Sequence, residues 1–141
     1  LRAIPLGTVS RVIAASPDYI ARNGLPAGGS DLSEHNCLLL SGFPHQASWP
    51  FMENGKRVSV AVFGTVASDS AETLLRAAVA GVGIIRLGDF LGAEALELGH
   101  LVPILTETHV GSEQPITALV QPGRVSVPHI RAFIDFLKSK A

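Results

Sequence analysis

The sequence predicts an α/β fold with a mixed sheet, and two observations carry this prediction. Short runs of β-branched and apolar residues alternate with segments of about ten residues whose apolar side chains recur at the helical period. Such alternation is typical of sheets covered by helices. The 141 residues are 47% hydrophobic and 16% charged, so the chain is large and apolar enough to bury a core.

The first predicted elements are a strand and a short helix. Residues 9–15 are β-branched and apolar, which predicts a strand. Ser16 is a natural N-cap and Pro17 suits the first helical position. Gly24 suits the C-terminal end of a helix over residues 17–23.

A linker and a hairpin follow. Residues 25–30 form the linker, a capping pattern predicts one helical turn over residues 31–34, and residues 37–41 are typical of a short buried strand. The Asn-Gly pair at 54–55, flanked by alternating apolar residues, predicts a β-hairpin over residues 51–62.

The remaining elements continue the alternation. The apolar period becomes helical near Asp69, which forms a capping pattern with Glu72, and Gly81 ends this helix. Asp89 is expected to cap a helix over residues 90–98. The other expected elements are strands over 83–87, 101–105 and 116–120 and a helix from Pro128.

Composition excludes several classes of protein. With 11 basic and 12 acidic residues, the chain lacks the clustered positive charge of a nucleic-acid-binding surface. The longest apolar run, residues 77–85, is far shorter than the about 18 residues that cross a bilayer. Cys37 is the single cysteine, so an intrachain disulfide is impossible and a buried apolar thiol is expected.

No catalytic or cofactor motif is found. The sequence contains no G-x-S-x-G string, and Arg86 stands where the third glycine of a dinucleotide-binding fingerprint would follow Gly81 and Gly83. The five histidines are too widely spaced for a metal motif, so surface or capping roles are expected for His35, His45, His100, His109 and His129. We therefore expect no enzyme activity, no metal and no cofactor.

Two strand-to-helix junctions are the most informative local features. One is Ser16-Pro17 and the other covers residues 65–70. Free backbone N–H groups at a helix start suit a carboxylate or another small polar ligand. Plain N-capping explains the same residues, and the pattern alone favours it. Trp49 is expected to fill the core rather than to stack on a ligand.

Five strings, in order and at suitable spacing, resemble the LysR-type transcriptional regulators. They cover almost the whole chain, from about Val9 to Leu137. In chain order they are Ala15-Ser16-Pro17-Asp18-Tyr19-Ile20-Ala21 with Gly24, Pro26, Asp31, Leu32 and His35; Trp49, Phe51 and Gly55; Ser68 to Glu72 with Ala78, Gly81, Val82 and Gly83; Gly99 to Leu105; and Phe133 to Leu137.

The resemblance implies a fold similar to that of periplasmic binding proteins, with two lobes joined by two crossovers and the ligand between them. Residues 1–27 and 116–141 are then expected to form a partial lobe I, and residues 28–115 to form lobe II. In this arrangement residues 1–24 and 116–141 meet as a strand pair with two helices. The rest of lobe I, a linker helix and a winged helix-turn-helix are expected upstream of Leu1.

The resemblance also implies an effector site. Ser16 is similar to the lobe I position that faces the cleft. Ser68 and Asp69 match the start of the lobe II helix that contacts the effector, with Thr65 and Val66 on the approach. Family members often carry Asn, Ser or Thr where Asp69 stands, which leaves open an amine-bearing, neutral or metal-associated effector.

The function implied is that of a cytoplasmic effector-sensing domain of a bacterial regulator. It would bind a small molecule, form a homodimer or higher homo-oligomer, and reach DNA only through the winged helix-turn-helix, without a membrane partner. The alternative is a solute-binding protein of a transport system. A small hydrolase or transferase is a third class, disfavoured because no nucleophile has a recognisable base.

Overall fold

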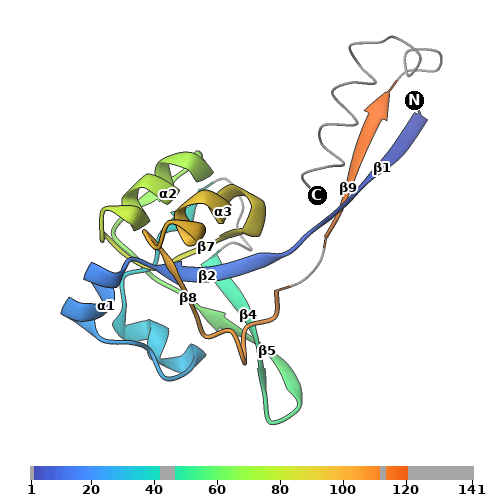
Figure 1. The fold of residues 1–141 in the computed structure, drawn as a ribbon. Helices are drawn as coiled ribbons and strands as arrows, with labels where there is room; N and C mark the ends of the chain where they lie inside the picture. The colour runs from blue at the N-terminus through green and yellow to red at the C-terminus, as the bar shows by residue number, and fades with distance from the viewer. Residues whose placement is uncertain (1, 42–46, 112–113, 121–141) are drawn as a thin grey trace. The chain divides into compact units, whose positions relative to one another are not determined.

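The computed structural model describes residues 2–41, 47–111 and 114–120 (Figure 1). The chain forms two compact units, each described here by itself. The terminal unit consists of residues 1–10 and 112–141, and the central unit of Arg11–Gly111. The helix expected from Pro128 lies outside the described residues.

The terminal unit contains a two-stranded antiparallel ladder of β1 (Arg2–Val9) and β9 (Gln114–Val120). Arg2 pairs with Val120, and the register shifts between Pro5 and Gly7. Pro5 has no N–H to donate to a ladder. The ladder thus pairs the backbone of the segments that flank the central unit.

The central unit is built on a mixed sheet, as predicted. Strand β2 (Arg11–Ala15) lies antiparallel between β7 (Ile85–Gly88) and β8 (Val102–Ile104). Strand β3 (Leu39–Leu40) pairs in parallel with β6 (Ala67–Ser68), and a parallel bridge between Cys37 and Ile84 joins β3 to β7. The bridge lies just before β3 and β7 and links the three-stranded sheet β8-β2-β7 to the pair β3-β6, and together they are called the central sheet here.

The division of the chain differs from the expected lobes. We expected boundaries after residues 27 and 115, whereas the two units divide after Ser10 and Gly111. The physical reason is the pairing of β2. Its hydrogen bonds go to β7 and β8, and the partner of β9 is β1. Residues 11–27, assigned above to lobe I, therefore pack within the central unit.

The two faces of the central sheet carry different covers. Helices α2 (Ala71–Val79) and α3 (Asp89–Glu97) pack on one, the helix face. The core there consists of Ala14, Leu38, Leu74, Ala78, Ile85, Leu87, Ala95 and Leu101. The hairpin of β4 (Ser48–Glu53) and β5 (Lys56–Ala61) and the 3-10 helix η1 (Gly29–Glu34) contribute to the other, the hairpin face. The core of this face includes Ile13, Tyr19, Leu32, Cys37, Trp49, Phe51, Val62, Ile84 and Ile104.

Several local predictions are confirmed. Helix α1 (Pro17–Asn23) starts at the Ser16 cap and ends at Gly24, whose φ of 83° is one that glycine adopts without strain. The hairpin turns at Asn54 and Gly55, with φ angles of 52° and 77°. Trp49 is buried in the core. Cys37 is also buried, and burial raises the pKa of its thiol to about 12.

Two predicted caps are wrong. Helix α2 is capped by Ser70, whose hydroxyl accepts a hydrogen bond of 3.2 Å from the Thr73 N–H. Asp69 precedes this cap. At α3 the cap position is Gly88, and Asp89 is the first helical residue. In both cases the acidic residue lies within one position of the cap, where its charge still complements the positive helix end.

The revised cap gives a testable difference between neighbouring residues. We expect Ser70→Ala to lower the free energy of unfolding by about 1 kcal/mol, because the Thr73 N–H loses its acceptor. Asp69→Asn, which keeps the cap intact, should change it by less than about 0.5 kcal/mol. Urea denaturation followed by circular dichroism measures both. If Asp69→Asn lowered the free energy of unfolding more than Ser70→Ala, Asp69 and not Ser70 would be the cap.

Candidate functional site

Strand directions give the central sheet two ends. Arg11 pairs with Gly88, so β2 begins where β7 ends. Strands β3 and β6 run in the same direction as β7 and end on the same side. We call this side the Arg11 end and the opposite side the Ser16 end. Both links to the terminal unit lie at the Arg11 end, because the backbone of Gly111 packs against the Arg11 carbonyl.

Ser68 and Asp69 lie at the Arg11 end. Ser68 ends β6, its carbonyl accepts a hydrogen bond of 2.9 Å from Ser41, and its hydroxyl accepts one of 3.1 Å from the Ser70 N–H. Asp69 is exposed at the start of α2. This places a hydroxyl and a carboxylate beside the first turn of a helix.

Ser16 lies at the opposite end of the sheet. Its side chain is 3% exposed and its hydroxyl caps α1, accepting a hydrogen bond of 3.0 Å from the Tyr19 N–H. Ser16 also belongs to the same compact unit as Ser68 and Asp69, and not to the other unit as the lobe assignment implied.

Thr65 also lies at the Ser16 end. Its N–H donates to Asn36 Oδ1 at 2.8 Å, and its hydroxyl lies 3.3 Å from the same atom. Asn36 Nδ2 donates to the Val82 carbonyl at 3.0 Å. Val66 packs on the helix-face core, and its carbonyl accepts a hydrogen bond from the Leu39 N–H. The five residues predicted for the effector site therefore do not form one cluster.

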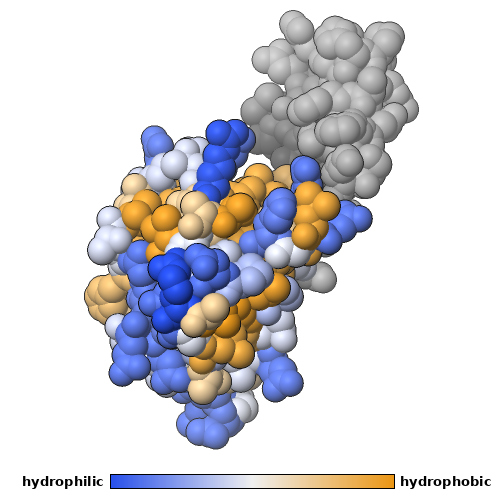
Figure 2. Space-filling model, turned by 60° about the vertical axis from the view of Figure 1, so that its left-hand side comes forward, coloured by the Kyte–Doolittle hydropathy of each residue, from blue (hydrophilic) through white to orange (hydrophobic). Residues whose placement is uncertain are grey.

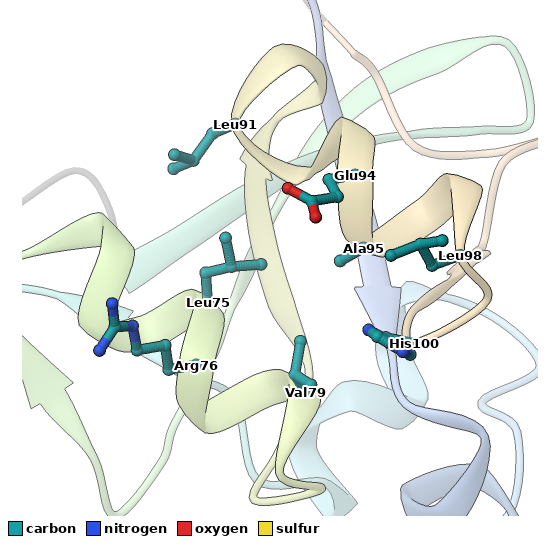
Figure 3. A pocket seen from close by; sticks show the side chains of 8 residues that line it. All are labelled: Leu75, Arg76, Val79, Leu91, Glu94, Ala95, Leu98 and His100. Atoms are coloured by element: carbon teal, nitrogen blue, oxygen red, sulfur yellow. The ribbon is translucent and has the colours of Figure 1, made fainter.

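A hollow of about 300 Å³ lies between α2 and α3 (Figure 3). It opens on the helix face, and none of the five predicted residues lines it. The lining residues are Leu75, Arg76, Val79, Leu91, Glu94, Ala95, Leu98 and His100. Apolar surface also appears elsewhere on this unit, interrupted by polar residues (Figure 2).

Sequence reasoning missed a second group of polar residues, which centres on Arg86. Its Nε donates to His109 Nε2 at 2.9 Å, and its Nη2 lies 3.5 Å from the Val110 carbonyl oxygen. The His109 ring packs edge-on against Phe51, with 5.9 Å between ring centroids. Burial and the Arg86 charge lower the pKa of His109 to about 4. His109 is thus a half-buried acceptor, where a surface or capping role was expected.

The depressed pKa of His109 predicts acid sensitivity. The unfolded imidazole takes up a proton near its ordinary pKa of 6.5, whereas the folded one stays neutral down to about 4. Between these two pH values the unfolded state binds more protons than the folded state. The free energy of unfolding is therefore highest above pH 6.5 and falls as the pH approaches 4. The half-buried His109 ring should lower the free energy of unfolding by roughly 2 kcal/mol over this pH range.

Urea denaturation between pH 7 and pH 4 measures this loss. His109→Gln should flatten the pH dependence, whereas His100→Gln, on the exposed surface, should leave it unchanged. Equal pH profiles for the wild type and His109→Gln would show that other groups cause the acid sensitivity.

The described residues contain neither a candidate membrane span nor a candidate metal cluster. No helix there is long and apolar enough to cross a membrane. Within the same part of the chain, no three His, Cys, Asp or Glu side chains gather in a way that could hold a metal ion.

The sequence-family model of the LysR substrate binding domain matches residues 1–141 of this chain. The chain belongs to this family. Relatives of the LysR domain include a probable HTH-type transcriptional regulator, LtrA, from Klebsiella pneumoniae, 32% identical over 97% of this chain and 45% of that protein. The HTH-type transcriptional regulator CrgA of Neisseria meningitidis serogroup B is 30% identical over 89% of this chain and 42% of that protein. The chain thus spans less than half the length of these relatives.

Solved structures give the same result for the fold. The LysR domain superimposes on the CrgA regulatory domain with a TM-score of 0.86 and 27% identity, covering 99% of this chain and 68% of that one. The superposition on full-length AphB of Vibrio cholerae has a TM-score of 0.80 and 25% identity. It covers 99% of this chain and 47% of the AphB chain. The periplasmic-binding-protein-like α/β fold is confirmed, and the alternative of a transport protein is not favoured.

Proposed function

We propose that this chain is the effector-sensing part of a transcriptional regulator. It binds a small molecule at the Arg11 end of the central unit, and binding modulates the affinity of a separate winged helix-turn-helix for DNA. The observation that carries the proposal is the family match over residues 1–141. We infer no catalysis, because the relatives are regulators and the sequence has no nucleophile with a recognisable base.

Within this function we assign effector contact to Ser68 and Asp69. They are the two predicted residues at the end where the chain crosses to the terminal unit. The exposed Asp69 carboxylate accepts hydrogen bonds and attracts positive charge, which favours an amine-bearing effector. Ser16 and Thr65 take structural roles instead, because their polar groups are bonded at the opposite end.

The wider assignments follow from the same family. We propose that the two units correspond to the two lobes, with crossovers at residues 10–11 and 111–112. The regulator works as a homodimer or higher homo-oligomer, and effector binding shifts the population of its conformations. Light scattering of the full-length protein tests the assembly, and a monomer at all concentrations contradicts it.

The experiment for the effector site uses the full-length regulator. A library of small amines and neutral metabolites is screened for a rise in melting temperature, and hits are titrated by calorimetry. Asp69→Asn and Ser68→Ala should each weaken binding about tenfold, a loss of about 1.4 kcal/mol, with little change in the melting temperature without ligand. The hit should also change the affinity for promoter DNA.

Thr65→Val is the matched control at the Ser16 end. It removes the hydroxyl contact with Asn36 and should leave the affinity unchanged. Unchanged affinity in Asp69→Asn and Ser68→Ala would reject these residues as the site. A hit that binds without altering DNA affinity would reject the sensor function itself.

A further inference from the structure

Two arginines, Arg11 and Arg86, lie on neighbouring strands toward the Arg11 end of the sheet. Arg86 on β7 pairs with Ile13, and Arg11 lies two residues before Ile13 on β2. Because alternate residues of a strand point to the same face, Arg11 and Arg86 share the face of Ile13, which belongs to the hairpin-face core.

A third arginine, Arg57, lies on the hairpin. Arg57 on β5 pairs with Met52 on β4, and the Met52 N–H donates to the Thr108 carbonyl at 2.8 Å. Thr108 directly precedes His109, the partner of Arg86. Strand β4 therefore lies between Arg57 and the segment that carries His109, and Arg57 acts on Arg86 only through its charge.

No acidic partner among the described residues neutralises Arg86. Burial, and after it the charges of Arg11 and Arg57, lower the pKa of its guanidinium to about 10. The ion pairs found in the described residues lie elsewhere, at Arg22–Asp18 and Arg76–Glu72. A half-buried cation that is repelled by like charges is costly unless an anion compensates it.

The guanidinium of Arg86 retains unused donors. Its Nε bonds to His109, and its Nη2 makes only a 3.5 Å contact with Val110 O. Its Nη1 has no hydrogen-bond partner in the part of the chain that the structure describes. A guanidinium carries five N–H donors in a planar fork that matches two oxygens of one anionic group.

We propose that Arg86, with Arg11 on the same face of the sheet, binds a small oxyanion through a carboxylate or phosphate group. The anion accepts hydrogen bonds from the unpaired N–H groups of the Arg86 guanidinium. Its negative charge offsets the repulsion among the three arginines. The site is distinct from Ser68, which ends β6, and from Asp69, which follows it, because β3 separates β6 from β7. The proposed anion site does not depend on whether Ser68 and Asp69 contact an effector.

Binding at this site has a spectroscopic signature in His109. Arg86 is the charged group that lowers the pKa of His109, and the ring also contacts Phe51. An anion on Arg86 reduces the repulsion that opposes protonation of the imidazole, so the pKa of His109 rises. Anions bound elsewhere on the surface would not produce this rise.

The test titrates the 141-residue chain with sodium phosphate and, separately, sodium succinate, against sodium chloride at equal ionic strength. Melting temperature reports binding, and nuclear magnetic resonance of the imidazole reports the pKa of His109. We expect saturable stabilisation by at least one oxyanion and a rise in that pKa. The oxyanion that saturates at the lower concentration identifies the preferred group. A response no greater than that to chloride overturns the proposal.

Variants separate the site from general charge effects. Arg86→Gln should weaken binding at least tenfold and abolish the His109 response, and Arg86→Lys should give an intermediate affinity because it keeps the charge without the fork. Arg76→Gln on the exposed surface of α2 is the matched control and should bind as the wild type does. Equal affinity in Arg86→Gln and Arg76→Gln overturns the proposal.

A second set of variants applies if Arg86→Gln fails to fold. Arg11→Gln and Arg57→Gln remove the flanking charges without removing Arg86, and each should weaken binding about threefold through reduced electrostatic attraction. Unchanged oxyanion binding in both variants overturns the proposal.

Discussion

Replacing Gly64 with alanine is expected to destabilise the central unit by about 3 kcal/mol or more. A methyl group at this position would overlap the Cys37 carbonyl oxygen and lie 2.8 Å from its carbonyl carbon. Both atoms are backbone, so no side-chain rotation relieves the clash. Movement would stretch the 2.9 Å bond from Cys37 N to Phe63 O, at the point where β3 is joined to β7.

Gly28→Ala is the matched control. No atom lies within 4 Å of a methyl group built there, and its φ of −159° is ordinary extended backbone. We expect a change of less than about 0.5 kcal/mol. Urea denaturation followed by circular dichroism compares the two variants. Similar stabilities would mean that the segment around Gly64 can move away from Cys37.

Trp49→Ala is the second substitution with a large expected effect, a loss of about 4 kcal/mol. The indole is 2% exposed and fills the hairpin-face core. Trp49 lies opposite Val60 in the hairpin, so its removal leaves a cavity between the hairpin and the sheet. The cost combines lost burial with that cavity.

Thermal unfolding followed by circular dichroism measures the loss, since the variant has no other tryptophan for fluorescence. Phe63→Ala, at a side chain that is 63% exposed, should cost less than about 1 kcal/mol. A small loss for Trp49→Ala would indicate that the hairpin contributes little to the stability of the central unit.

The features that could be predicted from the sequence are those set by neighbouring residues. The Ser16-Pro17 cap and the Asn54-Gly55 turn each depend on local backbone preferences, and both are found. The choice between Asp69 and Ser70 as cap was not local. Either side chain can cap a helix, and the start of α2 depends on where β6 stops pairing with β3.

The site was harder to predict because strand direction is not visible in a local pattern. Ser16 follows β2 and Ser68 ends β6, and a helix comes after each of them. Strands β2 and β6 run in opposite directions, however, and place the two serines at opposite ends of the sheet. Arg86 and His109 come together only because the 108–110 segment pairs with β4. The local pattern gives no signal for this cluster, because a charged residue that alternates with buried Ile85 and Leu87 is typical of any strand with one buried face.

The β1–β9 ladder has a consequence for how the protein is made. Strand β1 leaves the ribosome before the central unit, and its partner β9 is synthesised only after that unit. At the usual speed of translation, about 5–20 residues per second, β1 waits roughly 5–20 s for β9. During that delay its backbone groups are open to pairing with other chains. Nascent chains should therefore depend on chaperones most strongly before Gln114 to Val120 emerge.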